Sequence, residues 1–264
     1  QDDVAFKARI RCCNGERGNV GPGRIHETLG NLMFVDSIQN PVKAYGGSSI
    51  ESMEKALQRG ANILKSRRRL ISADDYVQEI LNFSDAIHKV RCVAGRTIDG
   101  GFQDNALTFC LLLKDFEEGS YSFYNVAGML KKHLLDNCEL TIAPEDLWVV
   151  EPVFARVCVD IWVEVMHMDD GFEVQNLLTD TLTEYLSPLR GQQGQGWEIG
   201  VLPRRSQILM KLNVLKSKAL IRRLVVTVRY TDQTGAHEVD LNDMEENPYM
   251  VCCSGSHRVI TAGR

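Results

Sequence analysis

The chain has 264 residues, of which 44% are hydrophobic and 25% charged, and it carries a formal net charge of -5 at pH 7. This length supports one large or two modest domains, and the composition is ordinary for a globular protein. The negative charge gives no general attraction to nucleic acid or an anionic membrane, and no apolar run approaches the roughly 20 residues of a membrane span. The chain begins with Gln1 rather than Met, so we expect the C-terminal part of a larger polypeptide.

The eight cysteines occur as two adjacent pairs and four single residues. No C-x-x-C spacing exists and no pair lies near paired histidines, so the sequence does not predict a zinc site. Three of the single cysteines lie in apolar, strand-like runs, where a thiol behaves as a small hydrophobe. We expect reduced, buried thiols, as in cytoplasmic proteins. The pairs are Cys12-Cys13 and Cys252-Cys253, and the three singles are Cys92, Cys110 and Cys158.

Residues 1–46 have little helical periodicity and many turn signals, which predict short strands and loops. A helix is expected after Gly47, because Ser48 and Glu51 have capping-box spacing. Its apolar stripe would consist of Ile50, Met53, Leu57, Ala61 and Leu64, and its end is the basic run Arg67, Arg68 and Arg69.

A second helix is expected directly after the first, because Ser72 and Asp75 have the same cap spacing. Strands at residues 88–93 and 106–113 and a helix over residues 123–137 follow. Residues 153–165 give the clearest strand signal, since apolar residues alternate with a mixed set along 13 positions.

The remaining elements form a second α+β series. We expect a helix over residues 173–186, whose end is marked by Pro188, and a shorter helix near residues 206–214. Strands are expected at residues 220–230 and 258–261. The fold class predicted is α+β, with a β-rich lead-in at residues 1–46 and two small α+β modules at residues 47–150 and 151–264.

The segment YLSPLRGQQGQGWEIG, residues 185–200, has the glycine density of a phosphate loop. A phosphate loop, however, precedes a helix, so that N–H groups of the helix N-terminus face the anion. Here Gly191, Gly194 and Gly196 follow a helix C-terminus, and no Lys-Ser or Lys-Thr comes after them. The order predicts a helix-terminating loop, with Trp197 pinning it to the core.

No other pattern predicts a catalytic or metal site. His167, Asp169 and Asp170 form a turn without a further ligand at a defined spacing, and no G-x-S-x-G elbow is present. Three separated basic runs lack the aromatic residues of nucleic-acid binders, which favours solvated helix ends or contacts with an acidic protein. A hydrolase whose site is assembled by folding, and a nucleic-acid-binding module, stay open as alternatives.

Four motifs in order resemble the baseplate J family of contractile phage tails. The first runs from G-N-V-x-x-G at residues 18–23 to N-P-x-x-A-x-G-G at residues 40–47, and the second is RLISADDY at residues 69–76, in which mild changes replace the family's R-x-V-T-x-E-D-Y. The third is F/Y-L-x-P-L-R-G followed by G-W-x-x-G within residues 185–200, and the last is S-G-x-H-x-V at residues 254–259. The resemblance marks as fold-determining Gly46, Gly47, Asp74, Asp75, Tyr76, Pro188, Gly191 and Gly200.

The resemblance implies a structural baseplate wedge subunit rather than an enzyme, without cofactor, metal or small-molecule substrate. Such a subunit would assemble in the bacterial cytoplasm, pair with itself or with other wedge proteins in a ring around the hub, and relay the trigger for sheath contraction. Its place would be the baseplate of a virion, prophage-derived tail or related injection particle, with no nucleic-acid or membrane partner. Candidate intersubunit contacts are Arg67, Arg68, Arg69, Arg190 and Trp197.

Overall fold

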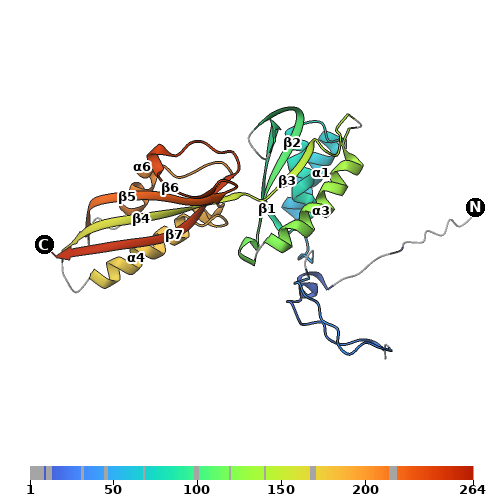
Figure 1. Cartoon of the computed structure of the whole chain (residues 1–264), viewed down its shortest axis with the longest axis horizontal. Helices are drawn as coiled ribbons and strands as arrows, with labels where there is room; N and C mark the ends of the chain where they lie inside the picture. Colours follow the sequence, from blue (N-terminus) through green and yellow to red (C-terminus); the bar gives the residue numbers. More distant parts are fainter. Residues whose placement is uncertain are drawn as a thin grey trace, which may run out of the picture. The chain divides into compact units, whose positions relative to one another are not determined.

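The computed structural model describes residue 9 and residues 14–30, 33–44, 47–67, 69–97, 101–118, 120–139, 141–166, 171–213 and 219–263. The chain divides into two compact units, Gln1–Ala86 and Ile87–Arg264, which are described separately below and can be followed by colour in Figure 1. The predicted boundaries near residues 46 and 150 stay predictions.

The first unit opens with an arm, residues 19–47, in which two extended segments run antiparallel (Figure 1). The Gly23 N–H donates to the Asn40 carbonyl at 2.8 Å, and the Ala44 N–H donates to the Val20 carbonyl at 2.8 Å. No regular strand is formed in the described part of residues 1–46, so the expected short strands are not found there. One reason is that the Asn40 side chain donates to the Gly21 carbonyl at 3.0 Å, in place of a backbone donor.

The base of the arm explains two positions of the first motif. The Asn19 amide accepts from the Gly47 N–H and donates to the Gly47 carbonyl, both at 2.8 Å. A Cβ at Gly47 would lie 2.2 Å from the Gly15 carbonyl oxygen, which excludes any side chain. Asn19 and Gly47 therefore clasp the two ends of the arm, while Gly46 lies outside the described residues.

The helix α1, Met53–Ser66, begins one turn later than the sequence predicts. Its N-cap is Ser52, whose hydroxyl accepts from the Lys55 N–H, and not Ser48. The expected capping box fails because the Glu51 carboxylate is taken by Arg59, with N–O distances of 3.0 and 2.8 Å. No α1 side chain is buried, and the predicted apolar stripe is exposed in this chain.

The helix α2, Ala73–Phe83, has the predicted capping box. The Asp75 N–H donates to the Ser72 hydroxyl at 3.2 Å, and the Ser72 N–H donates to the Asp75 carboxylate at 2.9 Å. The main-chain N–H and the hydroxyl of Ser72 lower the pKa of Asp75, because hydrogen bonds to its carboxylate stabilise the charged form. Tyr76 and Ile80 are the buried residues of α2, and Asp74 is exposed.

The second unit contains two sheets. In the first, β1 (Ile87–Arg96) pairs antiparallel with β2 (Phe102–Leu113), which pairs parallel with β3 (Leu147–Val150). The helix α3, Ser120–Asn137, connects β2 to β3. These elements confirm the predicted strands and helix, whereas the four-residue β3 gave no recognisable sequence signal.

The second sheet has the order β6-β5-β4-β7 (Figure 1). Its central strand β4, Val153–Val165, has the predicted bounds and pairs antiparallel with β5 (Ala219–Asp232) and parallel with β7 (Met250–Gly263). The short β6, Gly235–Asp240, pairs antiparallel with β5. β7 begins eight residues before the strand expected at residues 258–261, and an irregularity at Gly255 and Ser256 interrupts its pattern.

Three helices accompany this sheet: α4 (Gly171–Tyr185), the single turn α5 (Gly191–Gly194) and α6 (Arg205–Leu212). Alternate residues of β4 share one apolar core with side chains of α4 and α6, as the period-two pattern predicts. The fold class is therefore α+β. Within the described ranges, no helix is long and apolar enough to cross a membrane.

Candidate functional site

The glycine-rich loop after α4, residues 190–200, contacts strands of both sheets in the second unit. It turns first through α5, where the Gly191 N–H donates to the Ser187 carbonyl at 2.8 Å, and the Gly196 N–H closes back on the Gly191 carbonyl at 2.7 Å. Pro188 is buried just after the end of α4. The loop follows a helix C-terminus, as predicted.

Trp197 fixes the loop to the core. Its side chain is 1% exposed, and its indole N–H donates to the Tyr185 carbonyl at 2.7 Å. The Tyr185 and Trp197 rings meet edge to face with centroids 5.4 Å apart. A Cβ at Gly191 would lie 2.6 Å from the indole, so Gly191 is the residue that leaves room for Trp197. The pinning role predicted for Trp197 is confirmed.

The carbonyl oxygens of the loop accept hydrogen bonds from two cations of β1. The Lys89 ammonium donates to the Gly196 carbonyl at 3.0 Å and to the Glu198 carboxylate at 2.5 Å. The Arg91 guanidinium donates to the Ile199 carbonyl at 2.5 Å. A phosphate loop has the opposite polarity, since it turns N–H groups toward an anion. The arrangement fastens the loop to the first sheet.

Gly200 ends the loop at a point of close contact. Its φ is +83°, and its N–H donates to the Met250 carbonyl at 2.5 Å. A Cβ there would lie 1.7 Å from the Arg91 guanidinium and 3.1 Å from the Pro248 carbonyl oxygen. Glycine is therefore required both for the backbone conformation and for the approach of Arg91.

A small apolar core underlies this junction. It combines Cys110 and Leu112 of β2 with Ile199 of the loop and with residues at the start of β7. Burial raises the pKa of the Cys110 thiol to about 12. The junction of residues 190–200 with β1 is thus a mechanical connection between two sheets, built from carbonyl–cation bonds over a packed core.

The residues predicted as intersubunit contacts have different surroundings. Arg67 and Arg69 are exposed at the end of α1, and Arg67 is the left-handed C-cap with φ +53°. Arg68 lies outside the described residues. Arg190 is exposed, whereas Trp197 is buried within this chain. Their part in an intersubunit contact stays a prediction.

One serine–histidine pair occurs in the last motif. The Ser254 hydroxyl and the His257 Nε2 are 2.9 Å apart, at the irregularity of β7. Burial lowers the pKa of His257, and its Nδ1 has no hydrogen-bond partner among the described residues. A catalytic histidine is oriented by an acceptor at that second nitrogen. The pair is therefore better explained by the geometry of the strand than by nucleophilic catalysis.

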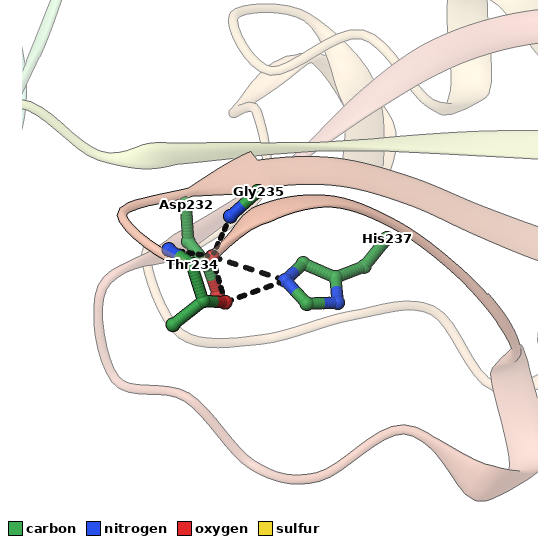
Figure 2. Close-up of polar contacts among 4 residues, drawn as sticks. All are labelled: Asp232, Thr234, Gly235 and His237. Atoms are coloured by element: carbon green, nitrogen blue, oxygen red, sulfur yellow. Dashed lines mark hydrogen bonds and ion pairs between the residues drawn. The ribbon is translucent and has the colours of Figure 1, made fainter.

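Asp232, Thr234 and His237 form a second polar group in the turn between β5 and β6 (Figure 2). The Asp232 Oδ1 accepts from the Thr234 hydroxyl at 2.6 Å and lies 3.0 Å from the His237 Nε2. The Thr234 hydroxyl is also 2.8 Å from the same Nε2. A triad would place the carboxylate and the hydroxyl on different ring nitrogens. Figure 2 instead shows a turn held around one carboxylate oxygen, which also accepts from the Gly235 N–H.

We expect the turn between β5 and β6 to make the free energy of unfolding depend on pH in the acid range. The hydrogen bond from Thr234 is the largest of the contacts that lower the pKa of Asp232 from 3.8 to about 2. Because the folded pKa is depressed, the stabilisation is present above pH 4 and is lost as the pH falls toward 2. We expect Asp232→Asn to lose less stability than the wild type between these values, measured by urea unfolding. Asp243→Asn, which removes an exposed carboxylate beyond the other end of β6, is the control. Equal losses in the wild type and Asp232→Asn would contradict the prediction.

The described cysteines are free thiols. Burial is the main reason for the raised pKa of five of these thiols: Cys92, Cys110, Cys138, Cys252 and Cys253. The pKa is about 11 for Cys92 and about 12 for Cys253, so neither is an activated nucleophile at neutral pH. Cys12 and Cys13 lie outside the described residues, as do His167, Asp169 and Asp170. In the part of the chain that is described, no cluster of three or more potential metal ligands occurs.

Sequence reasoning did not find Lys89 and Arg91. Each lies in a strand of ordinary composition, more than 100 residues from the carbonyl that it contacts. The only available signal was the alternation of cations along β1, which is equally typical of a solvated strand face.

Comparison with known proteins gives a likeness in fold to solved structures. No family model matches the chain, and no curated protein does. Among solved structures, a chain of the anti-feeding prophage (AFP) baseplate, solved by cryo-electron microscopy with 6-fold symmetry, matches with a TM-score of 0.51 and 13% identity. The match covers 89% of this chain and 48% of that chain, so this chain spans about half the length of the one it matches. At this identity the likeness concerns the fold.

Proposed function

We propose that the chain is a structural wedge subunit of the baseplate of a contractile phage tail or a related contractile injection system. The observation that carries the proposal is the fold shared with an AFP baseplate chain over 89% of this chain. The four sequence motifs, which occur in the order typical of the baseplate J family, add support that is independent of the fold comparison. Three of them coincide with structural features: the Asn19–Gly47 clasp, the Ser72–Asp75 capping box and the loop around Trp197.

The partners in this proposal are other baseplate wedge proteins and a second copy of the chain. The subunit assembles in the bacterial cytoplasm into a ring around the hub, and it acts without a cofactor or small-molecule substrate. Rigid short connections suit such a part, since forces must pass through it without local unfolding.

The junction of residues 190–200 with β1 suggests how a trigger is relayed. Lys89 and Arg91 hold the loop that follows α4 against the first sheet. A displacement of either sheet would therefore be passed to the other through the loop and the core beneath it. This is a role for a structural protein and requires no catalytic group.

Co-expression tests the proposed function most directly. The chain would be produced with the products of neighbouring genes and the assemblies viewed by electron microscopy. We expect rings or wedge-shaped oligomers that include this chain. Neighbouring genes that lack sheath, tube and spike proteins, together with a chain that enters no assembly, would overturn the proposal.

Charge reversal of the arginine run tests the proposed contact. We expect Arg67→Glu combined with Arg69→Glu to abolish or strongly reduce incorporation into the assembly, because both side chains are exposed and their charge suits an acidic partner. Lys132→Glu with Arg258→Glu is the control, since it changes the net charge equally at exposed sites on α3 and β7. Unchanged incorporation of the first variant by size-exclusion chromatography and microscopy would remove the run from the interface.

A further inference from the structure

One face of α1 carries an apolar stripe that the rest of the described chain leaves exposed. Met53, Leu57 and Leu64 are 75%, 66% and 80% exposed. Ile50, just before the helix, is 99% exposed, and Ala61 completes the stripe. These side chains follow one another at steps of three or four residues along about 20 Å of one helix face, whereas isolated surface residues need no explanation. The stripe is therefore a continuous contact surface.

The opposite side of α1 already packs on α2. The Asn62 amide donates to the Gln78 side chain at 3.0 Å, and Ala56 and Ile63 are half-buried. At about 3.6 residues per turn, these α1 residues lie away from the stripe, so that α2 does not cover it. A helix of this length takes most of its stability from the packing of its apolar face. A second partner is therefore needed on the stripe.

The charges beside the stripe indicate which partner fits. Glu51 is held by Arg59 of α1 at 2.8 Å, and Lys55 lies on the far side of the helix from the stripe. Glu54 in the first turn and Lys65 in the last turn are both exposed. They are about three complete turns apart, so they lie on the same flank of the stripe. This flank is acidic at one end of α1 and basic at the other.

A second copy of α1 in the antiparallel direction is complementary to this order. A two-fold axis through the contact reverses one helix and brings the same flank of both helices together. Glu54 of each copy then lies beside Lys65 of the other, and the stripe covers itself. A parallel pair would bring opposite flanks together and would not match these charges. Asp75 of α2 also acts on Lys65, but its carboxylate accepts from the Ser72 N–H and forms no ion pair with Lys65 in the described structure.

We propose that α1 forms an antiparallel contact with α1 of a second copy of this chain. The apolar stripe supplies the affinity, and the two Glu54–Lys65 pairs set the direction, because exposed ion pairs contribute little free energy of binding. A contact between two helices of 14 residues is smaller than a permanent interface, so the dimer is weak. The inference gives a surface to the self-pairing that the proposed function includes, and it rests on that function.

Sedimentation equilibrium of the full 264-residue chain tests the pairing. We expect a reversible monomer–dimer equilibrium in the micromolar range. Leu57→Gln combined with Leu64→Gln should weaken the dimer roughly a hundredfold or more, since each leucine is lost from both copies and its burial is worth about tenfold. Both side chains are exposed in the single chain, so the free energy of unfolding in urea at low concentration should change little.

Phe172→Gln combined with Met210→Gln is the matched control. These side chains are 74% and 72% exposed and lie on α4 and α6, away from the stripe. This variant should dimerise as the wild type does. A wild-type chain that stays monomeric at all concentrations, or an equal weakening in both double variants, would overturn the proposal.

Exchange of the two charges tests the direction of the helices. Glu54→Lys alone and Lys65→Glu alone should each weaken self-association severalfold, because attractive contacts become repulsive in both halves of the dimer. An equimolar mixture of the two variants should regain the wild-type affinity, since each contact again joins a cation to a carboxylate. Mixing changes neither monomer, so a loss of helix stability cannot imitate this gain. A mixture that associates no better than either variant would overturn the antiparallel pairing.

The outcome can be separated from that of the proposed function. A chain that does not dimerise through α1 but enters wedge-shaped assemblies on co-expression would overturn only the α1 contact. The same holds if the wild type stays monomeric and the Leu57→Gln, Leu64→Gln variant fails to assemble, because another wedge protein would then cover the stripe. A chain that dimerises through α1 and enters no assembly would support the contact and count against the wedge function.

Discussion

Replacing Gly200 by alanine should destabilise the second unit by about 3 to 5 kcal/mol. Two costs add. An L-residue at φ +83° is strained, and a Cβ would overlap the Arg91 guanidinium at 1.7 Å. Arg91 would have to leave the Ile199 carbonyl, which would break one of the bonds between the loop and β1. Urea unfolding followed by tryptophan fluorescence measures the loss.

Gly194→Ala separates the two costs. Gly194 has φ +96° in the same loop, but a Cβ there would meet no atom within 4 Å. This variant should lose only the strain energy, about 1 to 2 kcal/mol. If Gly194→Ala and Gly200→Ala lost the same free energy of unfolding, the contact between Gly200 and Arg91 would not contribute to stability. The junction of the loop with β1 would then be weaker than the distances indicate.

Trp197→Ala should cost about 3 to 5 kcal/mol, as is usual for truncation of a fully buried aromatic side chain. The residue is 1% exposed, so its removal leaves a cavity between α4 and the loop. The Tyr185 carbonyl also loses the indole donor that lies 2.7 Å away. The measurement is the free energy of unfolding in urea.

Trp197→Phe divides that loss into packing and hydrogen bonding. Phenylalanine retains much of the ring but cannot donate to Tyr185, so we expect a loss of about 1 to 3 kcal/mol. Trp148→Ala is the control, because Trp148 is 36% exposed and should cost less than Trp197→Ala. A loss at Trp197 no larger than that at Trp148 would contradict the pinning role.

Local signals in the sequence predicted local structure well. Ser72 and Asp75 form the expected capping box, because both partners lie within one helical turn. The alternation along residues 153–165 gave the bounds of β4, because each residue's face follows from its position in the strand. The same reasoning misplaced the start of α1, where Arg59 competes for Glu51 and leaves Ser52 as the cap.

The sequence predicted only part of the candidate site. The order of helix and glycines showed that the loop lacks the polarity of a phosphate site, and Trp197 was expected to anchor it. Its cationic partners could not be identified, since Lys89 and Gly196 are 107 residues apart and no local rule relates them. The β7 bulge was missed for a similar reason: Gly255 matters only beside Cys158 of another strand.

Local patterns in the amino-acid sequence were enough to predict the α+β class, the central strand β4, the cap of α2 and the polarity of the glycine-rich loop. These follow from interactions between residues a few positions apart, whose geometry is nearly the same in any fold. Only the folded chain shows which carbonyls accept from Lys89 and Arg91, and that Arg156 lies opposite Arg229. Those contacts depend on strand register and sheet order, because a shift of one residue in register would turn each side chain to the other face.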